Sequence, residues 1–359
     1  MKKTSIFISY YNSYPITSGS SAVTTSLFNS WPGKKKLFMM NHEANIKKKN
    51  IYNFFSPSNK PIFKIFLLIP YCIFIYFKIR KLNTKYIIFE GASWTGYILF
   101  TYIFLKIFLY KKKFIYHSHN VDFFFRQKSY IISKISFLFE KKILQNFDIS
   151  TAVSIKDCKK FYQYFKVKTK VLPNGILINK KFLKKIKINT KYIIFSGSLE
   201  YEQNKKIFSK LLKNEFRILK KYIPNIKIYL TGGGKFKFYK NNHDIIELGT
   251  LNLSDYMKCL TGALAIIVPG TSSTGTKVKV IEALSYNKIV FSTPNSLRGI
   301  ESKFDKFISY KNMNEFESKV KNFKNSNFKL KIFNEIGIYF RKNYDMKNIL
   351  QEFYAENNL

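Results

Sequence analysis

One segment, residues 266–282 (IIVPGTSSTGTKVKVIE), combines the features of a phosphate-binding loop. Its apolar start predicts a buried strand that ends near Gly270, and a helix is expected to begin near Thr276. The first N–H groups of a helix have no intrahelical partner, and Gly275 lets a ligand approach them, so such a loop can bind phosphate. Glu282, expected to be exposed about two turns into the helix, can accept hydrogen bonds from sugar or ribose hydroxyls. An ordinary β–α loop has the same spacing, so the segment alone leaves both interpretations open.

The same segment resembles a sequence box of the group 1 glycosyltransferases (glycosyltransferase family 4). That box, G-x-G-T-[RK]-x-K-x-x-E-A, is present here as STGTKVKVIEA at residues 273–283. Further motifs of the family follow in the expected order between residues 145 and 300, and an ordered series is more specific than any single motif. They are LPNG at 172–175, FSGSL at 195–199 with Asn204 and Lys205, YLTGGG at 229–234, LG at 248–249 and DY at 255–256.

The resemblance implies a GT-B fold, with two Rossmann-like, doubly wound parallel-sheet domains that face each other across a cleft. It also implies a retaining glycosyltransferase of the hexosyltransferase type, with Glu282 and His119 as its catalytic residues. Glu282 would hold the donor ribose, backbone amides would line the diphosphate, and Lys205 and Lys277 would neutralise it. Because fixed cations and N–H groups can stabilise a leaving diphosphate, no metal ion or other cofactor is expected. The donor-site residues that the resemblance implies are Gly197, Ser198, Lys205, Gly233, Thr274, Gly275, Thr276, Lys277 and Glu282, of which Gly197, Gly275 and Thr276 supply the amides.

The first half of the sequence matches the family more loosely. HSHNVD at residues 117–122 resembles an H-N-V-E stretch that follows a strand, and residues 140–154 resemble an E-x-x-x…a-D-x-x-x-x-v-S segment. The resemblance implies that His119 lies beside the transferred sugar, although a histidine hydrogen-bonded at a strand end would fit the same pattern. Residues expected to face the acceptor, or to form the first loop, are Ser18, Gly19 and Asn120.

Two positions depart from the commoner family pattern. The second Glu of the acidic motif, eight positions before Glu282, is Thr274 here, and the Arg after the first glycine of the second domain is Ser198. Both changes occur in a subset of the family with a G-S-x-x-Y-x-x-N pattern. They leave open how the sugar hydroxyls and the diphosphate charge are recognised. His42 and His243 have no metal-ligand spacing to each other or to a cysteine, so no metal site is expected.

Short apolar runs that alternate with longer amphipathic stretches predict the strands and helices of β–α units on parallel sheets. A chain of 359 residues exceeds the size of most single cores, and the turn signal Pro173-Asn174-Gly175 favours a boundary near residue 180. We expect an acceptor-binding domain at 1–180, a nucleotide-sugar-binding domain at 181–335, and a helical tail at 336–359 that packs back on the first domain. The predicted strands are 4–9, 36–39, 86–90, 114–117, 149–153, 169–172, 192–196, 226–230, 265–269 and 289–292.

The composition is strongly basic, with 62 Lys and Arg against 21 Asp and Glu and a net charge of +41. The lysine excess extends from Lys2 to Lys347 and accompanies excess Ile, Asn, Phe and Tyr, which is typical of an AT-rich genome. A basic surface that faces anionic lipid is the alternative explanation, and no nucleic-acid partner is expected. The three cysteines form no CxxC pair, which argues against a disulfide framework and indicates a reducing compartment. No signal peptide is expected from residues 1–10.

Two apolar stretches, residues 65–77 and 97–110, are shorter than the roughly 20 residues that a membrane-spanning helix needs. We expect buried or interfacial helices instead. Basic residues flank both stretches, which suggests an acceptor held at a membrane surface and a cytoplasmic location, peripheral at the inner face of the plasma membrane. The flanking residues are Lys78, Arg80, Lys81 and Lys111 to Lys113.

The predicted function is therefore transfer of a sugar from a UDP- or GDP-sugar to a glycan or lipid-linked acceptor in cell-surface polysaccharide or glycolipid synthesis. Two alternatives remain at this stage. A GT-B sugar-nucleotide epimerase would need acidic and histidine catalytic groups that the sequence does not identify. A basic α/β protein that binds nucleic acid would need its lysines gathered on one face with aromatic platforms.

Overall fold

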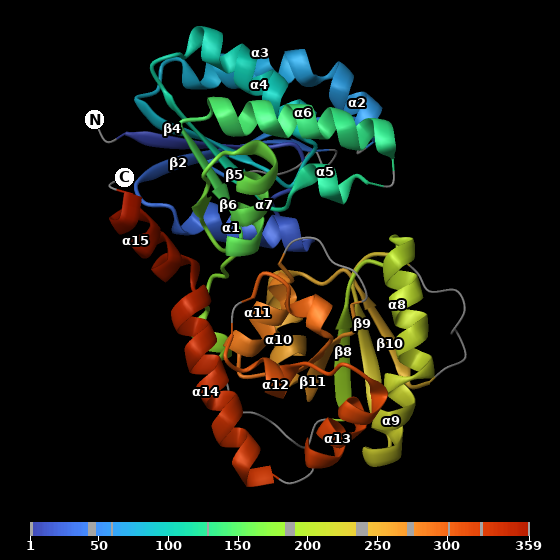
Figure 1. Cartoon of the computed structure of the whole chain (residues 1–359). Helices are drawn as coiled ribbons and strands as arrows, with labels where there is room; N and C mark the ends of the chain where they lie inside the picture. The colour runs from blue at the N-terminus through green and yellow to red at the C-terminus, as the bar shows by residue number, and fades with distance from the viewer. Residues whose placement is uncertain are drawn as a thin grey trace. The chain divides into compact units, whose positions relative to one another are not determined.

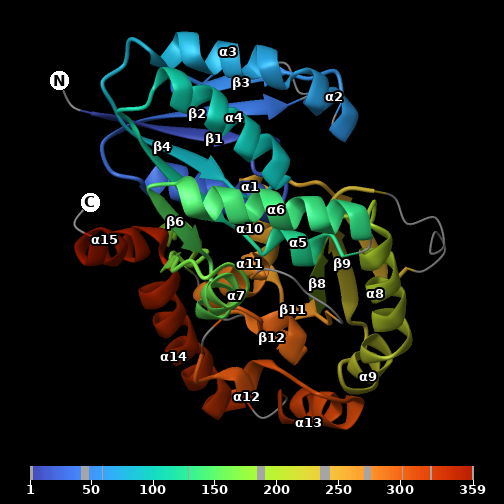
Figure 2. The same cartoon turned by 45° about the horizontal axis from the view of Figure 1, so that its top comes forward.

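The computed structural model describes residues 3–41, 48–58, 60–127, 129–183, 191–234, 243–270, 276–300, 302–323 and 326–357. The chain divides into two compact units. Unit 1 comprises Met1–Gly175 together with Ile349–Leu359, and unit 2 comprises Ile176–Asn348. Each unit contains a sheet with helices around it (Figures 1 and 2).

In the described residues of unit 1, seven parallel strands form a sheet in the order β3-β2-β1-β4-β5-β6-β7. The strands are β1 (Thr4–Ser9), β2 (Lys34–Asn41), β3 (Ile51–Phe55), β4 (Thr84–Glu90), β5 (Lys113–Ser118), β6 (Ile149–Ala152) and β7 (Lys170–Val171). The helices are α1 (Gly19–Ser30), α2 (Pro61–Phe66), α3 (Leu68–Ile79), α4 (Thr95–Phe108), α5 (Asp122–Phe125), α6 (Tyr130–Asn146), α7 (Ile155–Phe165) and most of α15 (Met346–Asn357).

In the described residues of unit 2, five parallel strands form a sheet in the order β10-β9-β8-β11-β12. The strands are β8 (Tyr192–Ser196), β9 (Lys227–Thr231), β10 (Ile245–Gly249), β11 (Ala265–Val268) and β12 (Ile289–Ser292). The α-helices are α8 (Glu202–Lys213), α9 (Glu215–Tyr222), α10 (Leu253–Gly262), α11 (Val278–Ser285), α12 (Asp305–Ile308), α13 (Met313–Phe323) and α14 (Ser326–Tyr344), and short 3₁₀ helices cover Lys180–Phe182 and Pro294–Leu297.

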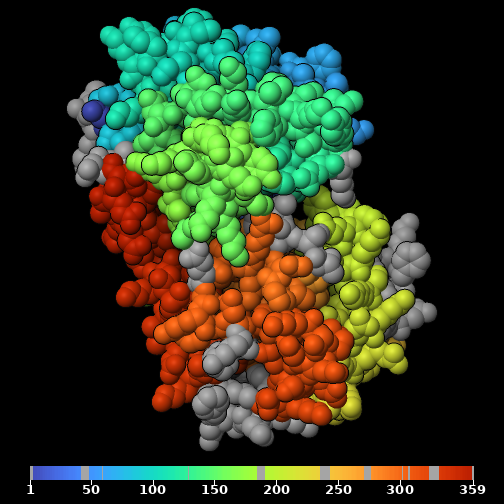
Figure 3. All heavy atoms as spheres, in the orientation of Figure 1, coloured from blue at the N-terminus to red at the C-terminus, as the bar shows by residue number. Residues whose placement is uncertain are grey.

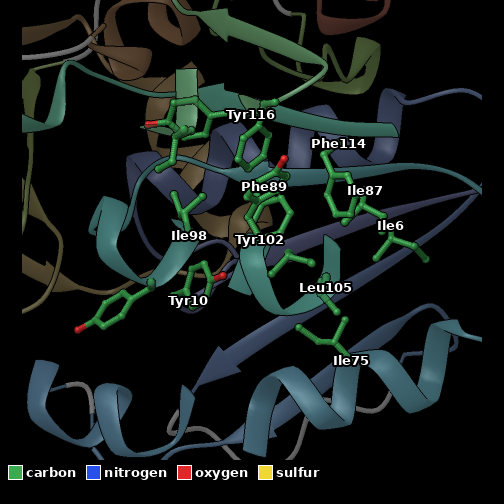
Figure 4. Packing of buried hydrophobic residues seen from close by; sticks show 14 of the residues in the cluster. Ile6, Tyr10, Ile75, Ile87, Phe89, Ile98, Tyr102, Leu105, Phe114 and Tyr116 are labelled. Carbon is green, nitrogen blue, oxygen red and sulfur yellow. The ribbon is translucent and has the colours of Figure 1, made fainter. Parts of the chain in front are cut away.

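The central strands of unit 1 are buried on both faces. Ile6 and Ile8 of β1 belong to the cluster formed with α3 and α4, which Figure 4 shows from close by. Phe7 points the opposite way, and its ring lies 5.4 Å from those of Phe28 and Trp31, at the end of α1. Because successive side chains of a strand point to opposite faces, a strand covered on both sides must be apolar nearly throughout.

Both sheets contain a point at which the strand order reverses. In unit 1 the chain leaves β1 toward β2 and β3 and then returns to β4 on the other side of β1. In unit 2 it leaves β8 toward β9 and β10 and returns to β11. Ligands of doubly wound proteins bind outside the carboxyl ends of the strands at such a point. Ligands are therefore expected at the carboxyl ends of β1 and β4 in unit 1, and of β8 and β11 in unit 2.

The structure confirms the predicted α/β fold with parallel sheets, and each predicted strand corresponds to an observed one. Two strands were not predicted, β3 and β10, which are edge strands in the described sheets. Only Ile51 of β3 is buried, and no residue of β10 is, although their runs, IYNFF and IIELG, contain apolar residues.

The two apolar stretches form ordinary helices of unit 1. The first is divided into α2 and α3 at Leu67, and Pro70 lies in the first turn of α3, where a missing N–H is tolerated. The second is α4. No helix in the described part of the chain is long and apolar enough to cross a membrane.

Candidate functional site

At the carboxyl edge of the unit 2 sheet, the loops after β8 and β9 are hydrogen-bonded to each other. The N–H of Gly197 donates to the carbonyl of Thr231 at 2.8 Å, and the N–H of Leu199 donates to the carbonyl of Gly233 at 2.7 Å. The hydroxyl of Ser198 also donates to the Gly233 carbonyl, at 3.1 Å. These bonds fix the two loops as one surface beside the reversal point.

Close packing of these loops requires glycine at position 232. Gly232 has a φ of +127°, and a Cβ on it would lie 2.7 Å from the carbonyl carbon and oxygen of Gly197. Both the backbone angle and the backbone contact exclude a side chain. At Gly197 the nearest atom to an added Cβ is Nδ2 of Asn204, at 3.2 Å, and that amide donates to the Ser198 carbonyl at 2.7 Å.

The start of helix α11 brings two lysines to this edge, since Lys277 is its N-cap and Lys279 lies in its first turn. Nζ of Lys279 donates to the carbonyl of Ser196, the last residue of β8, at 2.5 Å. Burial, with the charge of Lys277 as a second cause, lowers the pKa of Lys279 to about 8, and burial also lowers the pKa of Lys277. Burial therefore disfavours the positive charge of both lysines in the free protein. A bound anion would stabilise them.

The carboxyl group of Glu282 lies on the same helix. It is half-buried, where the sequence predicted an exposed side chain. Burial raises the pKa of Glu282 to about 7, although its interaction with the Tyr256 hydroxyl of α10 acts in the opposite direction. Tyr256 also interacts with Ser196, so the tyrosine lies between the carboxyl group and the end of β8.

The structure thus gathers most of the predicted donor-site residues at one edge of unit 2. Gly197, Ser198, Gly233, Lys277 and Glu282 lie on the three elements just described. The hydroxyl of Thr276 is buried and has no hydrogen-bond partner among the described residues. Two of the predicted residues, Thr274 and Gly275, lie outside the described residues.

Two of the expected roles need adjustment. The amide of Gly197 is already engaged by Thr231, so this residue offers a surface without a side chain rather than a free N–H. Lys205, in the first turn of α8, lies 3.7 Å from Glu202 in an exposed ion pair. Such pairs are weak, so the lysine can readily exchange this partner for a ligand.

Helix α11 begins at Val278, two residues later than predicted.

Sequence reasoning missed Lys279 and Tyr256 as site residues. Both were part of quoted motifs, KVKVIEA and DY, but the spacing of residues along a helix does not tell which of them reaches the end of a neighbouring strand. The signal that could have found Lys279 is its position three residues before Glu282, since residues at that separation share a helix face.

In unit 1, His119 lies in a buried polar cluster at the carboxyl edge of the sheet. Its Nε2 lies 2.8 Å from Oε2 of Glu90, the last residue of β4, and the same carboxylate oxygen accepts from the hydroxyl of Thr24 at 2.7 Å. The β4–β5 register pairs Glu90 with His117. Glu90 and His117 were not predicted as site residues, because they come from different strands and only the sheet register makes them neighbours.

The surroundings shift the pKa values of Glu90 and His117. Burial raises the pKa of Glu90, but a hydrogen bond from His119, the charges of His117 and His119, and a hydrogen bond from Thr24 together hold it below its ordinary value. Burial lowers the pKa of His117 to about 4. At neutral pH the cluster therefore contains an ionised carboxylate next to a neutral imidazole.

The other residues predicted for unit 1 lie at the start of α1 and in the loop after β5. Ser18 is the N-cap of α1 and accepts from the N–H of Ser21 at 3.1 Å, and Gly19 is the first residue of that helix, with open space around its α-carbon. Asn120 follows β5, its carbonyl accepts from the Ser118 hydroxyl, and its Oδ1 is buried without a partner among the described residues.

Two acidic residues of the looser unit 1 motifs, Asp122 and Glu140, have a structural role. The carboxylate of Glu140, on α6, accepts from the N–H of Asp122 at 2.9 Å and of Phe123 at 3.4 Å. The carboxylate of Asp122 in turn accepts from the N–H and hydroxyl of Thr95 and from Arg126. These contacts fix the segment that follows His119, so the motifs position the cluster.

No protein-family model matches the sequence, and no curated protein is significantly similar to it. Solved structures are similar in fold over nearly the whole chain. HepE from Anabaena, in complex with UDP and glucose, has a TM-score of 0.71 at 11% identity and covers 99% of both chains. Sucrose-phosphate synthase from Thermosynechococcus elongatus has a TM-score of 0.74 at 11% identity, covering 99% of this chain and 98% of its own. WaaG, a glycosyltransferase involved in lipopolysaccharide biosynthesis, has a TM-score of 0.66 at 11% identity, covering 98% and 99%.

The chain therefore has the fold of these proteins, the GT-B fold, as the sequence resemblance implied.

Proposed function

We propose that the protein is a glycosyltransferase that takes its sugar from a nucleotide-diphosphate sugar bound at the carboxyl edge of the unit 2 sheet. The observation that carries this proposal is the group formed by Lys277, Lys279 and Glu282 at the reversal point. It combines two lysines, whose positive charge burial disfavours, with a carboxyl group. Lys277 is the N-cap of the short helix α11, and Lys279 and Glu282 lie within it. A nucleotide-diphosphate sugar carries the matching groups, an anionic diphosphate and ribose hydroxyls.

In this proposal the two lysines stabilise the negative charge that grows on the diphosphate as the sugar leaves. Their desolvated setting strengthens that interaction relative to water, and their positions are fixed before reaction. Glu282 accepts hydrogen bonds from the ribose, which fixes the orientation of the donor. The Thr276 hydroxyl supplies a further donor to the diphosphate. The retaining outcome and the catalytic role of His119 rest on the sequence resemblance.

The nature of the acceptor is suggested by the surface of unit 1. Helices α2, α3, α4 and α6 carry many exposed apolar side chains, and α4 packs between α3 and α6. In Figure 3 residues of α3, α4 and α6 form the face at the top of unit 1. The exposed apolar residues are Ile62, Phe63, Ile65, Phe66, Ile69, Ile73, Phe77, Phe100, Ile103, Ile107, Phe108, Tyr130, Ile131, Ile132, Ile135 and Leu138.

Cations lie among these side chains. Nζ of Lys134 lies 4.3 Å from the ring centre of Tyr130, and the guanidinium of Arg80 lies 4.6 Å from that of Phe77. Apolar side chains mixed with cations bind anionic bilayers without crossing them. We therefore propose a lipid-linked or glycan acceptor at the inner face of the plasma membrane, in polysaccharide or glycolipid synthesis.

The donor proposal is tested by thermal shift of the full chain with UDP, GDP and their sugar conjugates at millimolar concentration. A nucleotide that stabilises the wild type should have little effect on Lys279→Met or Glu282→Gln. Lys258→Ala is the matched control, because Lys258 is an exposed lysine of unit 2 that pairs with Asp255. If no nucleotide shifts the wild type, or if the control loses the shift equally, the donor proposal fails.

The membrane proposal is tested by co-sedimentation with vesicles of phosphatidylglycerol and phosphatidylcholine, compared with phosphatidylcholine alone. Phe66 is 75% exposed and Ile107 is 66% exposed, so serine at both positions should weaken binding to anionic vesicles at least about tenfold. Ile338→Ser is the control, because Ile338 is 62% exposed but belongs to α14 of unit 2. Equal loss in the control, or no binding by the wild type, would refute this surface as a membrane contact.

A further inference from the structure

The cluster at the carboxyl edge of unit 1 brings together three groups that commonly bind metal ions. Glu90, His117 and His119 each offer a ligand atom, and these atoms all lie within 4.8 Å of one another. Glu90 ends β4, the adjoining strand β5 supplies His117, and His119 follows that strand two residues later. Glu90 and His117 are fully buried, and His119 is 7% exposed, so the cluster reaches solvent only at the His119 ring.

The two ring nitrogens of His117 have different surroundings. Nδ1 lies 2.9 Å from the Thr151 hydroxyl, and that hydroxyl also lies 3.3 Å from the carbonyl of Tyr116. Nε2 of His117 is buried and has no hydrogen-bond partner among the described residues.

Oε1 of Glu90 is in the same situation. Its partner oxygen, Oε2, accepts from Thr24 and lies against His119, but Oε1 is buried without a hydrogen-bond partner in the described part of the chain. The cluster thus contains two buried polar atoms without a partner in the described part of the chain. Buried polar atoms normally have a partner, and one bound cation would supply it to both.

We propose that Glu90, His117 and His119 form a binding site for a divalent transition-metal cation. Two imidazoles and a carboxylate are a common protein ligand set for zinc and related ions, with a further position left for water. Bonds of about 2.0–2.2 Å would place the ligand atoms roughly 3.3 Å apart. The present separations, 2.8 Å between His119 and Glu90 and at most 4.8 Å within the group, require shifts of only about 1.5 Å.

The residues around the cluster already orient the ligands as such a site requires. Thr151 fixes the ring of His117 through Nδ1, and the Tyr11 hydroxyl lies 2.6 Å from the Thr24 hydroxyl that holds Glu90. Hydrogen bonds of this kind to the outer side of a ligand normally accompany metal binding. Gly91 lets the chain after β4 pass close to β5, because a Cβ there would lie 2.6 Å from the His117 carbonyl.

A cation here would replace the hydrogen bond between Nε2 of His119 and Oε2 of Glu90. It would tie the end of β4 to the segment that follows β5, which includes Asn120. This role goes beyond the proposed transfer reaction, for which a metal ion is not required, and it can be tested without any sugar donor.

The test uses the full chain without a histidine tag, stripped of metal by a chelator, and titrated with Zn²⁺ and separately with Co²⁺. We expect one equivalent of bound metal by elemental analysis, visible absorption from bound Co²⁺, and no thiolate absorption. Glu90→Gln and His117→Ala should each weaken Zn²⁺ binding at least 100-fold, more than the roughly 10–100-fold expected when a ligand loses its outer partner. Thr151→Val, which removes such a partner from His117, should weaken binding about 10–100-fold.

His243→Ala is the matched control, since His243 is an exposed histidine of unit 2. It should bind metal as the wild type does. If His117→Ala fails to fold, as judged by circular dichroism, Glu90→Gln and Thr151→Val decide the question, because both nearly preserve side-chain shape. The proposal is overturned if the wild type binds no stoichiometric metal, which would leave a trapped water as the partner of the two buried atoms, or if Glu90→Gln and Thr151→Val bind metal as tightly as the wild type.

Discussion

Replacing Glu282 with glutamine should make the protein more stable at alkaline pH while it weakens donor binding. The folded-state pKa of Glu282 is about 7, against an ordinary value of 4.5. Because the folded pKa is raised, the native state binds the proton more tightly than the unfolded chain does. The resulting stabilisation is complete below pH 4.5 and is lost as the pH rises through 7. Above pH 7 the ionised carboxylate costs about 3 kcal/mol, an upper limit because the side chain keeps some exposure.

An uncharged amide of the same shape avoids this cost. The free energy of unfolding of Glu282→Gln, relative to wild type, should therefore rise by up to about 3 kcal/mol between pH 5 and pH 8. Urea denaturation at pH 5, 6.5 and 8 measures it, and taking the difference between the two proteins at each pH cancels the titration of other groups. For a domain of this size the gain corresponds to an increase in Tm of several degrees at pH 8.

The control for this experiment is Glu202→Gln, because Glu202 is 69% exposed and belongs to the same unit. It should show no comparable pH dependence. A stability difference for Glu282→Gln that is the same at pH 5 and pH 8 would refute the assigned burial cost. If the variant gained stability but kept full donor affinity, the carboxylate would be buried for structural reasons, and its role in ribose binding would be wrong.

Three further predictions concern unit 2. Lys279→Met should weaken binding of a nucleotide diphosphate by tenfold or more in calorimetry. It should also raise the free energy of unfolding at pH 7, because burial disfavours the charge of Lys279 and lowers its pKa to about 8. A variant that loses both binding and stability would contradict this. Gly232→Ala should destabilise unit 2 by about 2 kcal/mol or more in urea denaturation, since its Cβ would meet the Gly197 backbone. Gly249→Ala should cost only about 1 kcal/mol in the same assay, because Gly249 has a φ of +63° but no atom lies within 4 Å of an added Cβ. Equal losses of stability in the two glycine variants would show that the backbone angle, and not the contact with Gly197, causes them.

The sequence predicted the central strands of both sheets because burial on two faces leaves a clear pattern. The run that forms β8, YIIFS, is almost continuously apolar, and the run that forms β1, TSIFIS, has three consecutive apolar residues at its centre. The edge strands β3 and β10 were missed although their runs, IYNFF and IIELG, contain apolar residues. All residues of β10 are at least partly exposed, as expected for a strand paired on one side only. Such strands are recognisable only once their neighbours in the sheet are known.

The candidate site was predictable where its residues are close in the sequence. Glu282 and Lys277 lie within one box, and its spacing was informative without a structure. Contacts between distant segments were not predictable. Lys279 contacts Ser196, which is 83 residues away, and Glu90 contacts His119, which is 29 residues away. In both pairs the sheet topology, rather than the local sequence, makes the two residues neighbours.

The two units share a sheet topology but differ in the charged groups at its carboxyl edge. In each, the chain reverses its strand order and places polar side chains at the carboxyl ends of the strands beside the reversal. In unit 2 these are lysines whose charge burial disfavours, so the edge favours an anion. In unit 1 they include an ionised Glu90 and a neutral His117, so the edge favours a cation or a hydrogen donor. Since each edge is built within its own unit, substitutions in one can test its ligand while the other serves as an internal reference for folding.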